Sequence, residues 1–190
     1  MQRLQRSAQG WLLARELLGR PDEKVKFIGA LTIIVKLNTE RQDPPSLSLP
    51  VPPCPRPSIL NAKGHSANLS HGEAAELLQN LLQWFLKSLD EGTPLVPRKL
   101  CAALVTFFIH FPHLWTRCIR HLLVCLCVGG ACELDSASSV ADPEAILQPL
   151  GPRQLQGALW FSAALVEEVG KMDMNSAKQY IIFSRLESTS

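Results

Sequence analysis

A histidine and three cysteines lie close together in the chain and could bind a metal ion. His121, Cys125, Cys127 and Cys132 form the pattern H-x3-C-x-C-x4-C, and imidazole and thiolate groups are the usual ligands of structural zinc. The spacing does not match a known zinc template, and Cys125 and Cys127 would point about 200° apart on one helix. We therefore interpret the cysteines as small apolar core residues beside a surface histidine, with zinc binding as the alternative.

Two other groups of titratable residues could suggest catalysis. Glu167 and Glu168 are adjacent carboxylates, which diverge by about 100° on a helix and lack the Glu-x-x-His spacing of carboxylate-bridged metal sites. His110 and His113 flank Pro112, and no serine or aspartate motif lies nearby. We interpret the glutamates as a solvated pair that faces a partner and the histidines as capping or partly buried residues. The sequence thus predicts a protein that is not an enzyme, with no catalytic residue, no cofactor and no metal.

Composition narrows the class of protein. The chain has 190 residues, of which 46% are hydrophobic, so it can form a hydrophobic core. Its net charge is only +2, which is not the strongly positive charge that a nucleic-acid-binding protein carries. The apolar stretch 100–116 contains a proline and two histidines and is followed by arginine, so we expect no membrane insertion. The six cysteines and the absence of a signal-like amino terminus favour a reducing compartment.

The elements that must position these residues are expected to be helices, because apolar residues recur at spacings of three and four and no strand-like alternation occurs. The segment 22–38 opens with proline and acids, as a first helical turn prefers, and its wide apolar band requires neighbours on more than one side. Gly129 and Gly130 are expected to form a left-handed cap after 113–128. The expected helices span 2–18, 22–38, 72–90, 98–111, 113–128, 152–171 and 175–187.

The helices are expected to be divided into two blocks. Residues 1–38 form a first helical repeat, residues 39–70 form a proline-rich disordered insert, and residues 71–188 form further repeats. The helix–turn–helix rhythm favours an all-α, HEAT-like solenoid of stacked hairpins. A closed helical bundle would show similar patterns and is the alternative fold.

The first two predicted helices resemble a known family. The string LQRSAQGWLLARELL followed by VKFIGALTIIVKLN resembles the opening repeat of the importin-β (karyopherin-β) superfamily. The strings WFLKSLDEG, PRKLCAALVTFFIHFPHLWTRCIRHL and LWFSAALVEEVGKMDMNSAKQ are similar to repeats two to four of a fungal member related to the transportin-SR branch. The resemblance covers nearly all of the chain except 39–70 and the last few residues. The positions that carry the opening pattern are Leu4, Gln5, Ser7, Trp11, Val25, Lys26, Phe27, Ala30, Leu31 and Lys36.

This resemblance implies the amino-terminal part of a HEAT-repeat nuclear transport receptor that shuttles between cytoplasm and nucleus. Such receptors carry protein cargo past nuclear pore proteins, and their first repeats bind the GTP form of the small GTPase Ran, mainly through the second helix of each repeat. Carried to this chain, the resemblance points to Lys36 and Asn38 at the end of the first inner helix. It also points to Glu167 and Glu168 on a later inner helix.

Two other functions remain open at this stage. One is a truncated helical scaffold without transport activity, since the apolar string IIFSRL at 181–186 stands where a solenoid needs a polar capping helix. The other is a small helical-bundle metal protein or enzyme. A metal ion that stays bound to the protein during purification would indicate this function.

Overall fold

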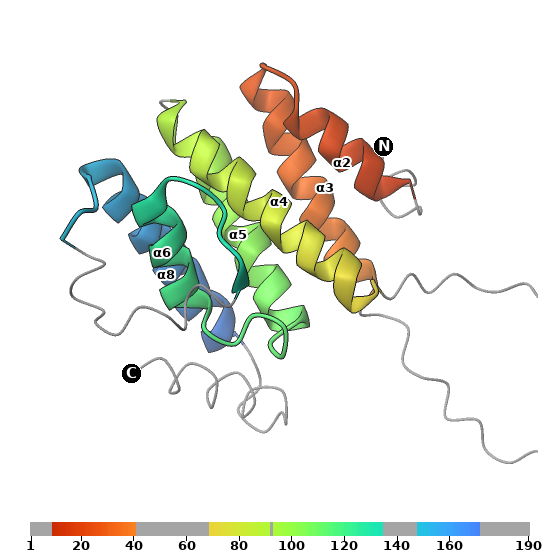
Figure 1. Cartoon of the computed structure of the whole chain (residues 1–190). Helices are drawn as coiled ribbons and strands as arrows, with labels where there is room; N and C mark the ends of the chain where they lie inside the picture. Colours follow the sequence, from red (N-terminus) through yellow and green to blue (C-terminus); the bar gives the residue numbers. More distant parts are fainter. Residues whose placement is uncertain (1–8, 41–68, 92, 135–147, 172–190) are drawn as a thin grey trace, which may run out of the picture.

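The structure, a computed structural model, describes residues 9–40, 69–91, 93–134 and 148–171, and the regular elements in these ranges are helices (Figure 1). The predicted all-α class is therefore confirmed. The expected helix at 175–187, most of the proline-rich 39–70 segment and residues 2–8 of the first expected helix lie outside the described residues. The helices are α2 (Gly10–Leu18), α3 (Glu23–Glu40), α4 (His71–Asp90), α5 (Leu95–His110), α6 (Cys118–Val128) and α8 (Pro152–Gly170).

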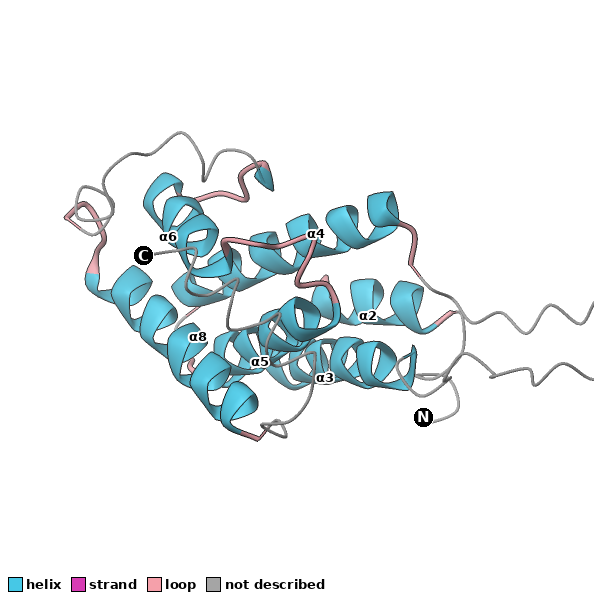
Figure 2. Cartoon of the chain, turned by 90° about the horizontal axis from the view of Figure 1, so that it is seen from below, coloured by secondary structure: helices cyan, strands magenta, loops and turns pink. Residues whose placement is uncertain are grey.

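The helices pack as successive pairs. Helix α2 packs against α3 and α4 against α5, while α3 also packs on α5, and α5 on α8. Helices α3 and α5 run in the same direction, because Phe27 lies near Lys99 at their amino-terminal halves and Asn38 lies near His110 at their carboxyl ends. Figure 2 shows α4 and α6 on one side of the body, with α3, α5 and α8 on the other. The expectation that the second helix has neighbours on two sides is confirmed.

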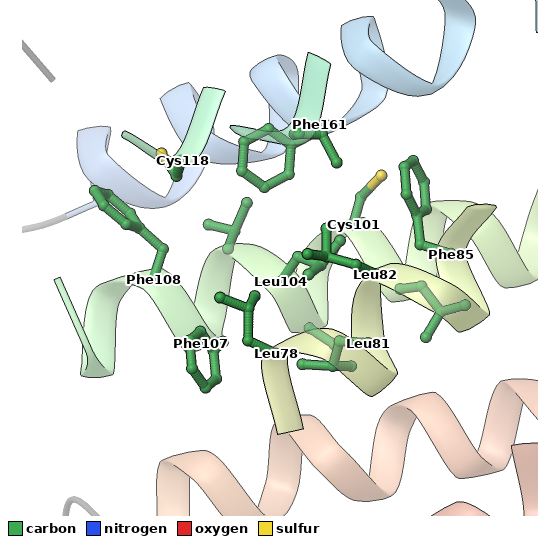
Figure 3. Close-up of a cluster of buried hydrophobic side chains, with 14 of the residues drawn as sticks. Leu78, Leu81, Leu82, Phe85, Cys101, Leu104, Phe107, Phe108, Cys118 and Phe161 are labelled. Carbon is green, nitrogen blue, oxygen red and sulfur yellow. The ribbon is translucent and has the colours of Figure 1, made fainter. Parts of the chain in front are cut away.

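The core is centred on α4 and α5 (Figure 3). Helix α5 lies among α3, α4 and α8, and most of its side chains are buried. Burial of these large apolar side chains supplies the main favourable free energy of folding. Side chains from four helices meet in this cluster, namely Leu78, Leu81, Leu82, Phe85, Cys101, Leu104, Phe107, Phe108, Cys118 and Phe161.

Two glycines allow neighbouring helices to approach closely. A Cβ atom on Gly29 would lie 2.8 Å from Leu18 Cγ and 3.0 Å from the Leu18 backbone nitrogen, between α3 and α2. A Cβ atom on Gly157 would lie 3.0 Å from both methyl carbons of Leu89 and 3.1 Å from Phe85 Cζ, between α8 and α4. Gly29 is therefore favoured by the short helix–helix distance, and a side chain at position 157 would require Leu89 and Phe85 to shift by a few tenths of an ångström.

The helix ends follow local chemistry that the sequence partly predicted. Ser70 and Glu73 form a capping box at the start of α4, in which the Glu73 carboxylate accepts the Ser70 N–H at 2.8 Å. The hydrogen bonds from Ser70 lower the pKa of Glu73. Gly129 ends α6 with φ of 72°, which confirms the left-handed cap.

Three predicted boundaries were wrong. Helix α6 begins at Cys118, not at 113, because the chain after Pro112 first makes a turn in which the N–H groups of Leu114 and Trp115 both donate to the Phe111 carbonyl. Helix α5 begins at Leu95, not at 98, since a proline in the first helical turn loses no hydrogen bond. Helix α3 continues to Glu40, so the first two residues assigned to the insert are helical.

Candidate functional site

The carboxyl ends of α3 and α5 form one exposed polar edge. Asn38 is exposed, and its Oδ1 atom lies 3.4 Å from Nε2 of His110 on the neighbouring helix. An amide oxygen accepts hydrogen bonds, so this contact requires the proton on His110 Nε2. In Figure 1 the carboxyl end of α8 lies on the same side of the body as these two ends. The predicted contact residues Asn38, Glu167 and Glu168 therefore belong to helices whose carboxyl ends lie on the same side of the body.

The acidic pair on α8 is partly neutralised by a lysine that the sequence reasoning missed. Lys171 Nζ donates to Glu167 at 2.8 Å and to Glu168 at 2.9 Å. The hydrogen bond from Lys171 lowers the pKa of Glu167, and the same pair of carboxylates raises the pKa of Lys171. A spacing of three and four residues between acids and a lysine is the sequence signal for such a cluster. This arrangement suits a charged contact with a partner and offers no unpaired carboxylate for acid–base catalysis.

Lys36, the remaining predicted contact residue, is not on this edge. Its side chain is only 3% exposed, and its Nζ atom lies 5.7 Å from the centre of the Trp11 ring on α2. Residues 36 and 38 point about 200° apart on a helix, so Lys36 faces α2 while Asn38 faces solvent. The structure therefore separates the two residues that the resemblance had grouped.

His121 is buried, and its prediction as a surface residue was wrong. Trp115 Nε1–H donates to His121 Nδ1 at 3.0 Å, and His121 Nε2 lies 3.1 Å from the Cys132 carbonyl oxygen. Because a carbonyl only accepts, the neutral ring carries its proton on Nε2. Burial lowers the pKa of His121, which favours this neutral form. The position of His121 three residues after Cys118 and four before Cys125 placed it on the buried face, and that spacing was the available signal.

The cysteines near His121 differ in environment, as their helical angles predicted. Cys125 is buried, accepts the Cys132 N–H at Sγ (3.4 Å), and has its pKa raised to about 12 by burial. Cys127 is exposed on the opposite side of α6. Within the described ranges, no three His, Cys, Asp or Glu side chains are placed to hold one metal ion. Both ring nitrogens of His121 are already used in hydrogen bonds, so the described geometry favours a structural polar network over a zinc site.

Two cations of α5 are held against aromatic rings of its neighbours. Arg98 lies 5.5 Å from the centre of the Trp160 ring on α8, and Lys99 lies 5.3 Å from the Phe27 ring on α3. Contacts of this kind contribute about 0.5–1 kcal/mol at exposed sites. The sequence suggested only a short basic cluster here, because the facing rings come from helices distant in the chain.

An apolar groove separates α2 from α4. Its volume is about 310 Å³, and Leu12 on its rim is 65% exposed. The indole N–H of Trp11 is buried there, with no hydrogen-bond acceptor among the described residues. Such a groove has the size and lining to receive one large apolar side chain of a partner. Its walls come from Trp11, Leu12, Ala14, Arg15, Ile33, Leu69, Glu73, Glu76, Leu77, Asn80 and Trp84.

Comparisons with protein-family models, with curated proteins and with solved structures found no match to this chain. In the part of the chain that the structure describes, no helix combines the length and apolar character needed to cross a membrane.

Proposed function

We propose that this chain is a non-enzymatic binding scaffold, built as a HEAT-like solenoid piece of an importin-β-type nuclear transport receptor. The observation that carries the proposal is the repeated packing of helix pairs, in which α3 and α5 run parallel in one layer and α8 continues that layer. Stacked helix pairs present extended surfaces for binding. The sequence resemblance to the opening repeats of the importin-β superfamily points to the same architecture.

The proposed partner of the exposed edge is Ran in its GTP form. Asn38 supplies an amide, and Glu167 and Glu168 supply one net negative charge after pairing with Lys171. Binding would use these polar groups, without a cofactor, without direct nucleic-acid contact and without membrane insertion. The protein would shuttle between cytoplasm and nucleus, and further surfaces would meet protein cargo.

The groove between α2 and α4 is the surface that we assign to nuclear pore proteins. Its aromatic walls and exposed Leu12 suit a large apolar side chain of an extended partner segment. The acidic residues on its rim, Glu73 and Glu76, would favour segments without strong negative charge.

The test is titration of the purified chain with Ran loaded with a non-hydrolysable GTP analogue or with GDP. We expect GTP-selective binding that Glu167→Lys weakens about three- to tenfold, since one exposed charge contact contributes about 0.2–1 kcal/mol and reversal also adds repulsion. The matched control is Glu16→Lys, which makes the same charge change on α2, where Glu16 is also exposed. If a folded, monodisperse chain binds neither form of Ran, the proposal is wrong for this chain.

One observation favours a second candidate, a truncated helical scaffold without transport activity. Helix α8 exposes large apolar side chains, among them Leu159 and Val166 at 69% and 73% exposure. An exposed apolar helix face is expected in a helical scaffold that lacks the element needed to cover it. Under this alternative the chain would fold as described yet bind Ran in neither nucleotide state.

A further inference from the structure

Two cysteine side chains meet at the carboxyl end of α6. Gly129 ends the helix in the left-handed conformation, and the N–H groups of Gly129 and Gly130 donate to the Cys125 carbonyl at 2.9 and 3.2 Å. A cap of this kind turns the chain back toward the last turn of the helix. As a result the Cys132 N–H donates to Cys125 Sγ at 3.4 Å, although the two cysteines lie seven positions apart in the chain.

The position of Cys132 is also fixed by groups outside this turn. Its carbonyl oxygen accepts a hydrogen bond from Gln79 Nε2 on α4 at 2.6 Å and lies 3.1 Å from His121 Nε2. Its Sγ atom donates to the Gly130 carbonyl at 3.6 Å. Burial raises the pKa of Cys125 to about 12, and a hydrogen bond between the Cys125 and Cys132 side chains also raises it. The two thiols are therefore in contact in the folded chain.

The cysteines of this region differ in their access to solvent. Cys132 is half-buried and Cys125 is buried, while Cys127 is exposed. Cys125 and Cys127 point about 200° apart on α6, so Cys127 faces away from the contact between the other two. A small oxidant in solvent can therefore reach Cys132, and the thiol that lies beside Cys132 is that of Cys125.

We propose that Cys125 and Cys132 are a peroxide-responsive thiol pair that forms an intramolecular disulfide. The Cys132 thiolate attacks one oxygen of hydrogen peroxide, the O–O bond breaks, hydroxide leaves, and Cys132 becomes a sulfenic acid. The Cys125 sulfur then attacks the Cys132 sulfur, the S–O bond breaks and a second hydroxide leaves. The two thiol protons convert the two hydroxides to water. Two thiols and one peroxide thus give one disulfide and two waters, and two electrons pass from sulfur to peroxide.

The surroundings of the pair suit a reversible modification. The sequence favours a reducing compartment, where disulfides are transient and commonly sense oxidants. The second step is intramolecular between groups already in contact, which accelerates it. The disulfide would join the segment after α6 covalently to that helix, next to the hydrogen bond from Gln79. None of these residues belongs to the surface proposed for Ran, so this inference and the proposed function can fail separately.

The test compares two single variants of the full chain. Cys127→Ser leaves the pair Cys125 and Cys132, whereas Cys125→Ser leaves Cys127 and Cys132, so the variants are matched in composition. After treatment with hydrogen peroxide, free thiols are alkylated and trypsin releases peptide 121–153, which contains no further cysteine. Mass spectrometry identifies the disulfide as an unalkylated peptide that is two hydrogens lighter and that dithiothreitol restores.

We expect the disulfide to form at least about tenfold faster in Cys127→Ser than in Cys125→Ser, because only the first variant keeps two thiols in contact. In concentrated urea the ratio should fall to about one, since the two loops differ little in length. Circular dichroism shows whether Cys125→Ser is folded, and Cys125→Ala replaces it if it is not.

Three results would overturn this inference. The first is an equal rate of disulfide formation in the two folded variants. The second is a folded Cys127→Ser chain in which Cys132 stops at the sulfenic acid, trapped with dimedone, and forms no disulfide. The third is a pair that reacts with peroxide only after urea unfolds the chain.

Discussion

Replacement of His121 by leucine tests the buried polar network between the turn after α5, helix α6 and the segment that follows it. Trp115 is 1% exposed, and its indole N–H has His121 Nδ1 as its acceptor. Leaving a buried donor unpaired costs about 1–3 kcal/mol, and loss of the hydrogen bond to the Cys132 carbonyl adds about 0.5–1.5 kcal/mol. We expect His121→Leu to lower the free energy of unfolding by roughly 2–4 kcal/mol in total.

The assay is urea unfolding followed by circular dichroism, which does not depend on tryptophan fluorescence. A loss of this size would lower the melting temperature by roughly 4–16 °C in a chain of this length. His113→Leu is the matched control, because His113 is exposed and its replacement should change stability by less than about 0.5 kcal/mol.

A double-mutant cycle with Trp115→Phe isolates the hydrogen bond itself. Phenylalanine has no N–H group, so His121→Leu should cost at least about 1 kcal/mol less in that background than in the unmodified chain. Equal costs in both backgrounds would refute the assignment of His121 Nδ1 as the acceptor. A loss below about 0.5 kcal/mol in His121→Leu alone would refute the network as a source of stability.

Two further predictions concern stability. Gly157→Ala should not gain the stabilisation of about 1 kcal/mol that alanine normally brings to a helix interior, because the added methyl group would press on both methyl carbons of Leu89 and on the Phe85 ring. Gly72→Ala, with open space around it, should be neutral or slightly stabilising by thermal melting. Stability should also fall as pH drops below about 6.5, because the folded pKa of His121 lies below the unfolded value and the unfolded chain then binds more protons. Urea midpoints at pH 7.5, 6.5 and 5.5 should show this decline, with a smaller slope in His121→Leu; an identical slope would contradict it.

Much of the fold followed from local pattern. The apolar spacing predicted the described helices and the all-α class, and Gly129 predicted the left-handed end of α6. The start of α6 was predicted wrongly because the chain after Pro112 could form either a helix or a turn. Which of the two forms depends on which N–H groups donate hydrogen bonds to the Phe111 carbonyl. Such outcomes depend on tertiary burial of the aromatic residues in that turn, which single-sequence pattern does not contain.

The candidate site was less predictable than the fold, because its contacts join residues far apart in the chain. The hydrogen bond between Asn38 and His110 and the packing of Arg98 on Trp160 require knowledge of which helices are neighbours. The pairing of Lys171 with the two glutamates, by contrast, was available from spacing alone. Ion pairs within one helix could thus be predicted from the sequence. The residues that meet on a surface formed by several helices could not.

Lys36 shows how a residue carried over from a resemblance can act inside the protein instead of at its surface. Its ammonium group lies over Trp11 at 3% exposure, so Lys36→Glu would place a carboxylate in a buried position against an aromatic face. We expect a loss of about 2–4 kcal/mol for Lys36→Glu, whereas Lys36→Met keeps the apolar stem and should lose about 1 kcal/mol.

These expectations determine how Ran titrations of Lys36 variants must be interpreted. If Lys36 acts through packing, Lys36→Met should bind Ran·GTP as the unmodified chain does, and any weakening by Lys36→Glu should match the fraction of chain that is unfolded in circular dichroism. A Lys36→Met variant that keeps its stability but loses GTP-selective binding would show that the ammonium group itself reaches the partner. In that case α2 must move away from α3 when Ran binds, because the Trp11 ring otherwise lies beside this group.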